Sequence, residues 1–117
     1  GLVEPGEAMT DAAVREFHEE TGLYLKVVLA DDMYTKPRFT TVGMTDEACG
    51  MVYGYASGVP DNRFEESSED IQVVLADKKE VRRILKEENV AMMCAYMLLH
   101  FLKSEGDPLG FVEMQEK

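Results

Sequence analysis

The spacing of apolar and polar residues along the chain predicts a domain that contains both helices and strands. Apolar residues that recur every three or four positions predict three helices, over Thr10–Thr21, Lys78–Glu87 and Val90–Ser104. Short runs rich in aromatic, β-branched and apolar residues predict strands over Tyr24–Leu29, Ala48–Ser57 and Ile71–Leu75. The segment 31–46 contains Pro37 and Gly43 and is predicted to hold strand pieces around a loop. This mixture indicates one α/β or α+β layered domain over residues 1–117.

Residues at the ends of the first predicted helix fit its boundaries. Thr10 is expected to be the N-cap, and Asp11 would favour the positive end of the helix dipole. Gly22 is suited to a left-handed stop after the helix. The last predicted helix carries a stripe that is expected to face the core, and its members are Met93, Tyr96, Met97, His100 and Phe101. The polar tail from Glu105 is expected to fray.

Charge and hydropathy argue against two classes of partner, nucleic acids and membranes. The formal net charge of −11 disfavours a nucleic-acid binder, which would need a basic stripe. The longest apolar stretch, Val90–Leu102, is shorter than a membrane span and is interrupted by polar residues, so no membrane partner is expected. Cys49 and Cys94 lack metal-type spacing and are expected to be reduced thiols in a cytoplasmic protein.

Three glutamates are expected to lie on one face of the first helix. At about 100° per residue, Glu16, Glu19 and Glu20 fall within roughly 100° of one another. Like charges at this spacing are mutually unfavourable unless a cation neutralises them. A hard divalent cation such as Mg²⁺ prefers carboxylate oxygens, water and substrate phosphate. The spacing alone also fits a solvated acidic face, so its specificity comes from the surrounding residues.

The surrounding residues form a long motif. The pattern Gly1-x5-Glu7-x7-Arg15-Glu16-Phe17-x-Glu19-Glu20-x-Gly22-Leu23 resembles the Nudix box, with all fixed positions matched over residues 1–23. The resemblance implies an α/β/α sandwich whose mixed sheet holds this loop-helix-loop. It also implies that Glu16, Glu19 and Glu20 are metal ligands for Mg²⁺ or Mn²⁺, with Glu7 as an auxiliary acid of the metal site. By the same resemblance Arg15 orients the glutamates through ion pairs.

The rest of the chain is similar to the ADP-ribose pyrophosphatase branch of that family. The segment 41–47 resembles a loop of the branch that contacts the substrate, which implies contacts from Gly43, Met44 and Glu47. The segment 65–71 resembles its acidic catalytic loop, and on that match Glu69 is the first candidate for the general base and Glu66 the second. The implied activity is Mg²⁺-dependent hydrolysis of ADP-ribose to AMP and ribose 5-phosphate.

Three alternatives stay open at this point. The substrate could be another nucleotide sugar or a dinucleotide, or the domain could bind a nucleotide without cleaving it. The chain has no initiator Met and enters the motif at its first residue, so we expect it to lack the N-terminal strands of the family. The third alternative is therefore a truncated chain that is inactive by itself and pairs its exposed sheet edges in a homodimer.

Overall fold

The computed structural model of the protein describes residues 2–61 and 71–112. The chain divides into two compact units. The first consists of Gly1–Val73 with Val112–Lys117, and the second of Val74–Phe111. The expected mixture of helices and strands is confirmed, and the strands of the described residues form two antiparallel two-stranded sheets. Among these residues, no helix is both long and apolar enough to cross a bilayer.

The first unit is built around α1 (Met9–Thr21), which ends at the predicted glycine. Gly22 adopts a left-handed conformation with φ of 75°, and its N–H donates to the carbonyl oxygen of His18 at 2.8 Å. The start of the helix differs from the prediction. Ala8 occupies the N-cap position, because the Ala12 N–H donates to the Ala8 carbonyl oxygen at 3.0 Å, and alanine has no side-chain acceptor that could cap the helix. The prediction that Thr10 caps the helix is therefore wrong.

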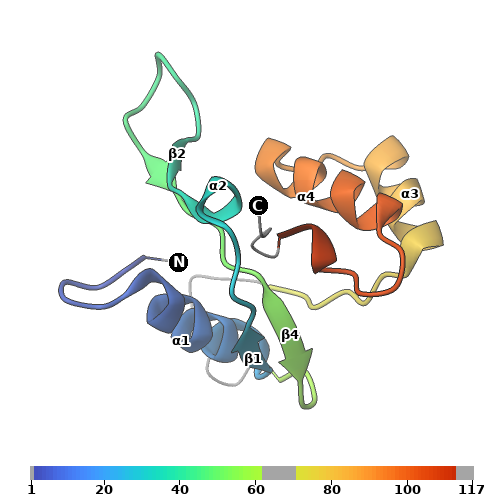
Figure 1. Cartoon of the computed structure of the whole chain (residues 1–117), viewed down its shortest axis with the longest axis horizontal. Helices are drawn as coiled ribbons and strands as arrows, with labels where there is room; N and C mark the ends of the chain where they lie inside the picture. The colour runs from blue at the N-terminus through green and yellow to red at the C-terminus, as the bar shows by residue number, and fades with distance from the viewer. Residues whose placement is uncertain (1, 62–70, 113–117) are drawn as a thin grey trace, which may run out of the picture. The chain divides into compact units, whose positions relative to one another are not determined.

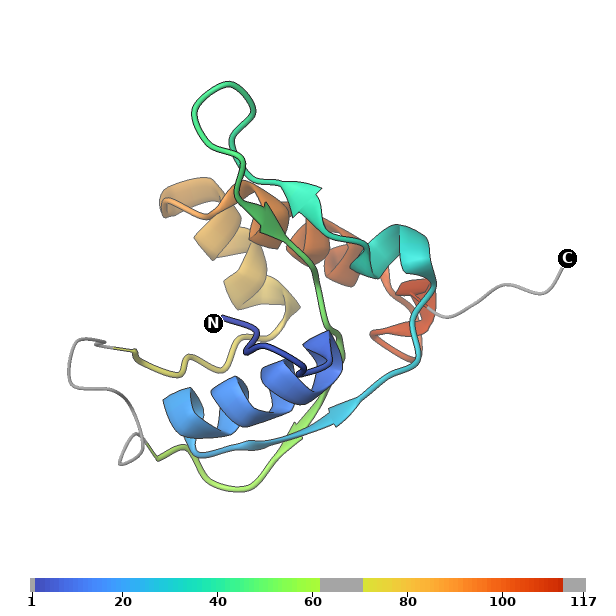
Figure 2. The same cartoon turned by 90° about the vertical axis from the view of Figure 1, so that its left-hand side faces the viewer.

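One side of α1 packs against strand β1 (Tyr24–Val27), which pairs with β4 (Gly54–Ser57). Both views show α1 running beside this strand pair (Figures 1 and 2). The register sets Lys26 opposite Tyr55 and Val27 opposite Gly54. A Cβ atom at Gly54 would collide with the backbone carbonyl oxygen of Lys26, which cannot move aside as a side chain can, so this cross-strand position requires glycine.

Residues 31–57 form more elements than the sequence predicted. Asp31 accepts the N–H of Met33 at 3.0 Å and caps a short helix, α2 (Asp32–Thr35), where strand pieces were expected. The predicted strand Ala48–Ser57 is divided into two, because β3 (Ala48–Cys49) pairs with β2 (Arg38–Phe39) whereas β4 pairs with β1. The chain changes partner between them, where the N–H of Met51 donates to the carbonyl oxygen of Thr35 at 3.2 Å.

The second unit contains two helices, α3 (Lys78–Glu87) and α4 (Met92–Lys103), which contact each other. The predicted bounds of α3 are confirmed, and Val81 is its buried anchor. The predicted core stripe of α4 is wrong in part, because Tyr96 is 63% exposed and His100 is exposed and stacks on Phe111. The predicted strand Ile71–Leu75 is also wrong, since these residues pair with no strand in the described chain. Within residues 105–112 the expectation of a frayed tail is wrong for η1 (Gly110–Val112), whose last residue, Val112, belongs to the first unit and is buried.

The start of α3 depends on Asp77, whose carboxylate accepts the N–H of Glu80 at 2.8 Å. Replacing Asp77 with Ala is expected to lower the free energy of unfolding by about 1 kcal/mol, because the helix N–H group loses its acceptor. Urea denaturation measures the loss. The Asp77→Asn variant keeps a cap oxygen and is expected to retain most of the stability, so an equal loss in both variants would contradict a capping role.

Candidate functional site

The candidate site is the face of α1 that carries the glutamates. The side chains of Glu16 and Glu19 are 24% and 39% exposed, and Glu20 is half-buried. The buried residues of α1 are Ala12 and Thr21, and Thr21 lies roughly 140° around the helix from Glu16. The hydroxyl group of Thr21 donates to the carbonyl oxygen of Phe17 at 2.6 Å and accepts the N–H of Leu23 at 3.1 Å. The fold thus anchors one side of α1 and leaves carboxylates on the other accessible.

Arg15 lies at the edge of this face and contacts three carboxylates. Its Nε and Nη2 atoms each donate to one oxygen of Glu7, both at 3.0 Å. Its Nη1 atom donates to Glu16 at 3.1 Å and to Glu19 at 3.4 Å. The expected pairing of Arg15 with the glutamates of the helix is therefore present in the structure.

The loop before α1 is folded back onto Arg15. The N–H of Glu7 donates to the carbonyl oxygen of Glu4 at 3.0 Å, and the N–H of Glu4 donates to the Glu7 carboxylate at 3.1 Å. Gly6, with φ of 79°, supplies the left-handed residue of this turn. Arg15 Nη2 also donates to the carbonyl oxygen of Leu2 at 3.2 Å. One guanidinium group therefore connects residues 2–7 to the helix.

These contacts change the ionisation of the pair. The hydrogen bond from Arg15, with a second one from the backbone of Glu4, lowers the pKa of Glu7 from 4.5 to about 2. The hydrogen bond to Glu7 raises the pKa of Arg15 further above its usual range. The pair is therefore fully charged at neutral pH.

The pH dependence of stability follows from the lowered pKa of Glu7. The stability that the ionised Glu7 carboxylate contributes is expected to be complete above the ordinary carboxyl pKa of 4.5. It is expected to be lost as the pH falls towards about 2. The thermal midpoints of the wild type and of the Glu7→Gln variant should therefore differ at neutral pH and converge in that acid range. The Asp46→Asn variant removes an exposed charge distant in sequence from Arg15 and controls for net charge. A midpoint difference that stays constant from pH 7 to pH 2 would contradict this assignment.

The donor set of the glutamate face suits a hard cation. Its side chains offer carboxylate oxygens, and a cationic group, the guanidinium of Arg15, already lies against two of them. Within residues 2–61 and 71–112, no three Asp, Glu, His or Cys side chains are gathered as a metal-binding group. Mg²⁺ is commonly held by one or two carboxylates, with water and phosphate completing the shell. The carboxylates of α1 therefore fit such an ion in chemistry, and Arg15 contacts two of them.

The other predicted site residues lie elsewhere in the described chain or outside it. Gly43 and Met44 lie in the loop between β2 and β3, where Met44 is 85% exposed. Glu47 contacts only its own hairpin among the bonds described, since its N–H donates to the Thr45 hydroxyl at 3.1 Å, its carbonyl oxygen accepts the N–H of Thr40 at 3.2 Å and its carboxylate accepts from Cys49 Sγ at 3.6 Å. Glu66 and Glu69 lie outside the described residues.

Asp61 is a neighbour of the site that the sequence analysis missed. Its N–H donates to the carbonyl oxygen of Thr21 at 2.6 Å, at the end of α1. A Cβ atom at Gly22 would lie 2.7 Å from the backbone nitrogen of Asp61. The chain thus returns to the end of α1 directly before the segment that includes Glu66 and Glu69. No local signal could reveal this contact, because 40 positions separate Thr21 from Asp61.

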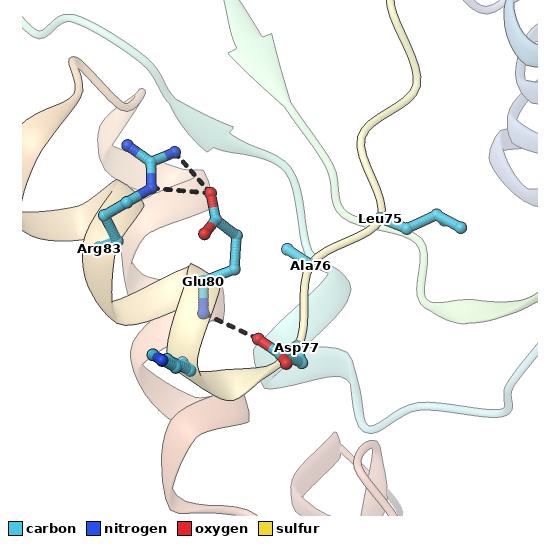
Figure 3. Close-up of a pocket in the computed structure, with 6 residues that line it drawn as sticks. Leu75, Ala76, Asp77, Glu80 and Arg83 are labelled. Carbon is cyan, nitrogen blue, oxygen red and sulfur yellow. Dashed lines mark hydrogen bonds and ion pairs between the residues drawn. The ribbon is translucent and has the colours of Figure 1, made fainter.

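The second unit has an open pocket at the start of α3 (Figure 3), lined by Leu75, Ala76, Asp77, Lys79, Glu80 and Arg83. Three of its charged groups, Asp77, Glu80 and Arg83, make local hydrogen bonds. Arg83 donates to Glu80 from Nε at 2.8 Å and from Nη2 at 2.5 Å, and Asp77 caps the helix as described above. These contacts stabilise the helix, and we assign no ligand to the pocket.

Comparison with known proteins gives one family. Residues 1–100 match the family model of the NUDIX domain. No curated protein and no solved structure matches the chain. The match includes α1, the Arg15 contacts and Asp61.

Proposed function

Since the chain belongs to the NUDIX domain family, whose members are pyrophosphohydrolases, we propose that it hydrolyses ADP-ribose to AMP and ribose 5-phosphate. Enzymes of this family act on nucleoside diphosphates and generally use divalent metal ions such as Mg²⁺. One observation carries the proposal for this chain: a single guanidinium group collects Glu7, Glu16 and Glu19 beside the helix face. Such a concentration of carboxylates suits a site where a cation neutralises a diphosphate.

The proposed roles follow the positions of the residues on α1 and around it. Glu16, Glu19 and Glu20 would hold Mg²⁺, or Mn²⁺ in its place. The metal ion would supply charge neutralisation for the diphosphate. Until the metal ion binds, Arg15 would keep the carboxylates of Glu16 and Glu19 close to each other through Nη1.

The chemical step needs a base and a way to orient the substrate. We assign the base to Glu69, with Glu66 as the second candidate; it would accept the proton of the water that attacks phosphorus. The oxygen that bridged the two phosphorus atoms leaves with one product, so one water molecule yields AMP and ribose 5-phosphate. Gly43, Met44 and Glu47 are the proposed substrate contacts, on the loop between β2 and β3.

A substrate panel tests the proposal. ADP-ribose, other nucleotide sugars and dinucleotides are incubated with the protein and Mg²⁺, with chelator in parallel. We expect AMP to be released from ADP-ribose only in the presence of the metal ion. Release from a different compound would change the substrate assignment. Nucleotide binding without cleavage of any compound would instead favour a binding domain. Measuring the mass in solution tests the predicted homodimer at the same time.

A further inference from the structure

Arg15 uses every hydrogen-bond donor that an arginine has. A guanidinium group carries five N–H bonds. Those of Nε and Nη2 reach the two oxygens of Glu7 and the carbonyl oxygen of Leu2. The two N–H bonds of Nη1 reach one oxygen of Glu16 and one oxygen of Glu19. Three donors therefore hold the loop 2–7 and two hold the helix.

The two sets of contacts differ in geometry. Glu7 receives two parallel hydrogen bonds of 3.0 Å each, the two-pronged arrangement that is strongest for arginine and a carboxylate. Glu7 is also the less exposed partner, at 17% against 39% for Glu19. The Nη1 contacts are single, and the one to Glu19 measures 3.4 Å. Single contacts between exposed ions contribute little to stability, so the helix side of Arg15 is the easier side to release.

The position of Nη1 determines what the release of the helix contacts by Arg15 would allow. The same nitrogen atom contacts both Glu16 and Glu19, so it occupies a point at which their carboxylates converge. A cation that binds these two oxygens, Oε1 of Glu16 and Oε2 of Glu19, together would have to replace it. The two hydrogen bonds from Arg15 to Glu7 and the hydrogen bond to the carbonyl oxygen of Leu2 do not need to change.

We infer that Arg15 is the resting counter-ion of the glutamate face, and that it exchanges with the divalent cation. This inference rests on the proposed metal-dependent function. When the metal ion binds, Arg15 releases Glu16 and Glu19 but stays attached to Glu7 and to the carbonyl group of Leu2. Glu7 is then a positioning residue that restrains Arg15, and not a metal ligand.

Two substitutions are expected to shift metal affinity in opposite directions. In the Arg15→Lys variant the ammonium group keeps the positive charge but cannot contact Glu7 and the two helix glutamates at the same time. Mn²⁺ is therefore expected to bind roughly two- to fivefold more tightly. In the Glu7→Gln variant Arg15 loses its ionic anchor and pairs more fully with Glu16 and Glu19. Mn²⁺ is then expected to bind more weakly by a similar factor.

Calorimetric titration of Mn²⁺ into the whole chain, without substrate, measures these affinities. The double variant Arg15→Lys with Glu7→Gln separates the two roles of Glu7. If Glu7 acts through Arg15, its replacement is expected to have little effect in the Arg15→Lys background. If Glu7 is a ligand, the same weakening persists there, and the inference is overturned. Equal or weaker binding by Arg15→Lys alone also overturns it.

A measurement on the wild type guards against misfolded variants. In NMR spectra, the Arg15 Nε–H signal is expected to persist with little shift when Mg²⁺ is added, because Nε stays on Glu7. Loss of this hydrogen bond on metal addition would contradict the exchange. Failure of the proposed function would give a different result, because neither the wild type nor the Glu20→Gln variant would then bind Mn²⁺.

Discussion

Replacing Glu20 with Gln is expected to reduce metal-dependent turnover at least about a hundredfold while leaving the fold intact. The change preserves the size of the side chain and removes one charge from the proposed ligand set. Glu16 and Glu19 are less suited to this test, because both contact Arg15. Their replacement would disturb the loop 2–7 together with the metal site. The measurement is the rate of AMP release from ADP-ribose at saturating Mg²⁺.

A matched control lies on the same helix. Asp11 is exposed in the first turn of α1, about 140° around the helix from Glu16. The Asp11→Asn variant removes the same charge from the same element and is expected to keep turnover within about twofold, as for other surface substitutions with small effects. Wild-type turnover in the Glu20→Gln variant would refute its assignment as a ligand. An equal loss in both variants would show that net charge, and not the ligand set, controls the rate.

Replacing Gly22 with Ala is expected to destabilise the protein by about 3 kcal/mol or more. The left-handed conformation, with φ of 75°, costs an L-residue roughly 1–2 kcal/mol. The new Cβ atom would also lie 2.7 Å from the backbone nitrogen and from the Cβ atom of Asp61. Backbone cannot rotate away as a side chain can, so the 2.6 Å hydrogen bond from Asp61 to Thr21 must lengthen or break. Urea denaturation measures the loss of stability.

Gly6 provides the comparison that separates the two costs. It has almost the same conformation, with φ of 79°, but a Cβ atom there would meet nothing within 4 Å. The Gly6→Ala variant is therefore expected to lose about 1 kcal/mol, the conformational cost offset in part by a less flexible unfolded chain. Similar losses of stability in the two variants would mean that the close approach of Asp61 to Gly22 adds nothing to the cost. The Gly22→Ala variant is also expected to lose activity, because Asp61 directly precedes the segment with Glu66 and Glu69.

The amino-acid sequence determined the local features of this protein. The glutamate spacing on α1, the stop at Gly22 and the bounds of α3 follow from interactions within a few positions of the chain, which is why they could be predicted. The pairing of Arg15 with Glu19 belongs to the same group, since the two residues are one helical turn apart. The motif around these residues also indicated the family that the comparison found.

Only the tertiary structure decided which distant segments meet. The division of residues 48–57 between two strand partners depends on β1 and β2, and the sequence of the segment itself does not encode the change. The same holds for the return of Asp61 to the end of α1 and for the fold of loop 2–7 around Arg15. Hydrogen bonds between segments far apart in the chain depend on how the elements pack, and periodicity carries no information about that packing. For this reason the sequence identified the carboxylates, whereas the structure showed that Arg15 occupies the point between two of them.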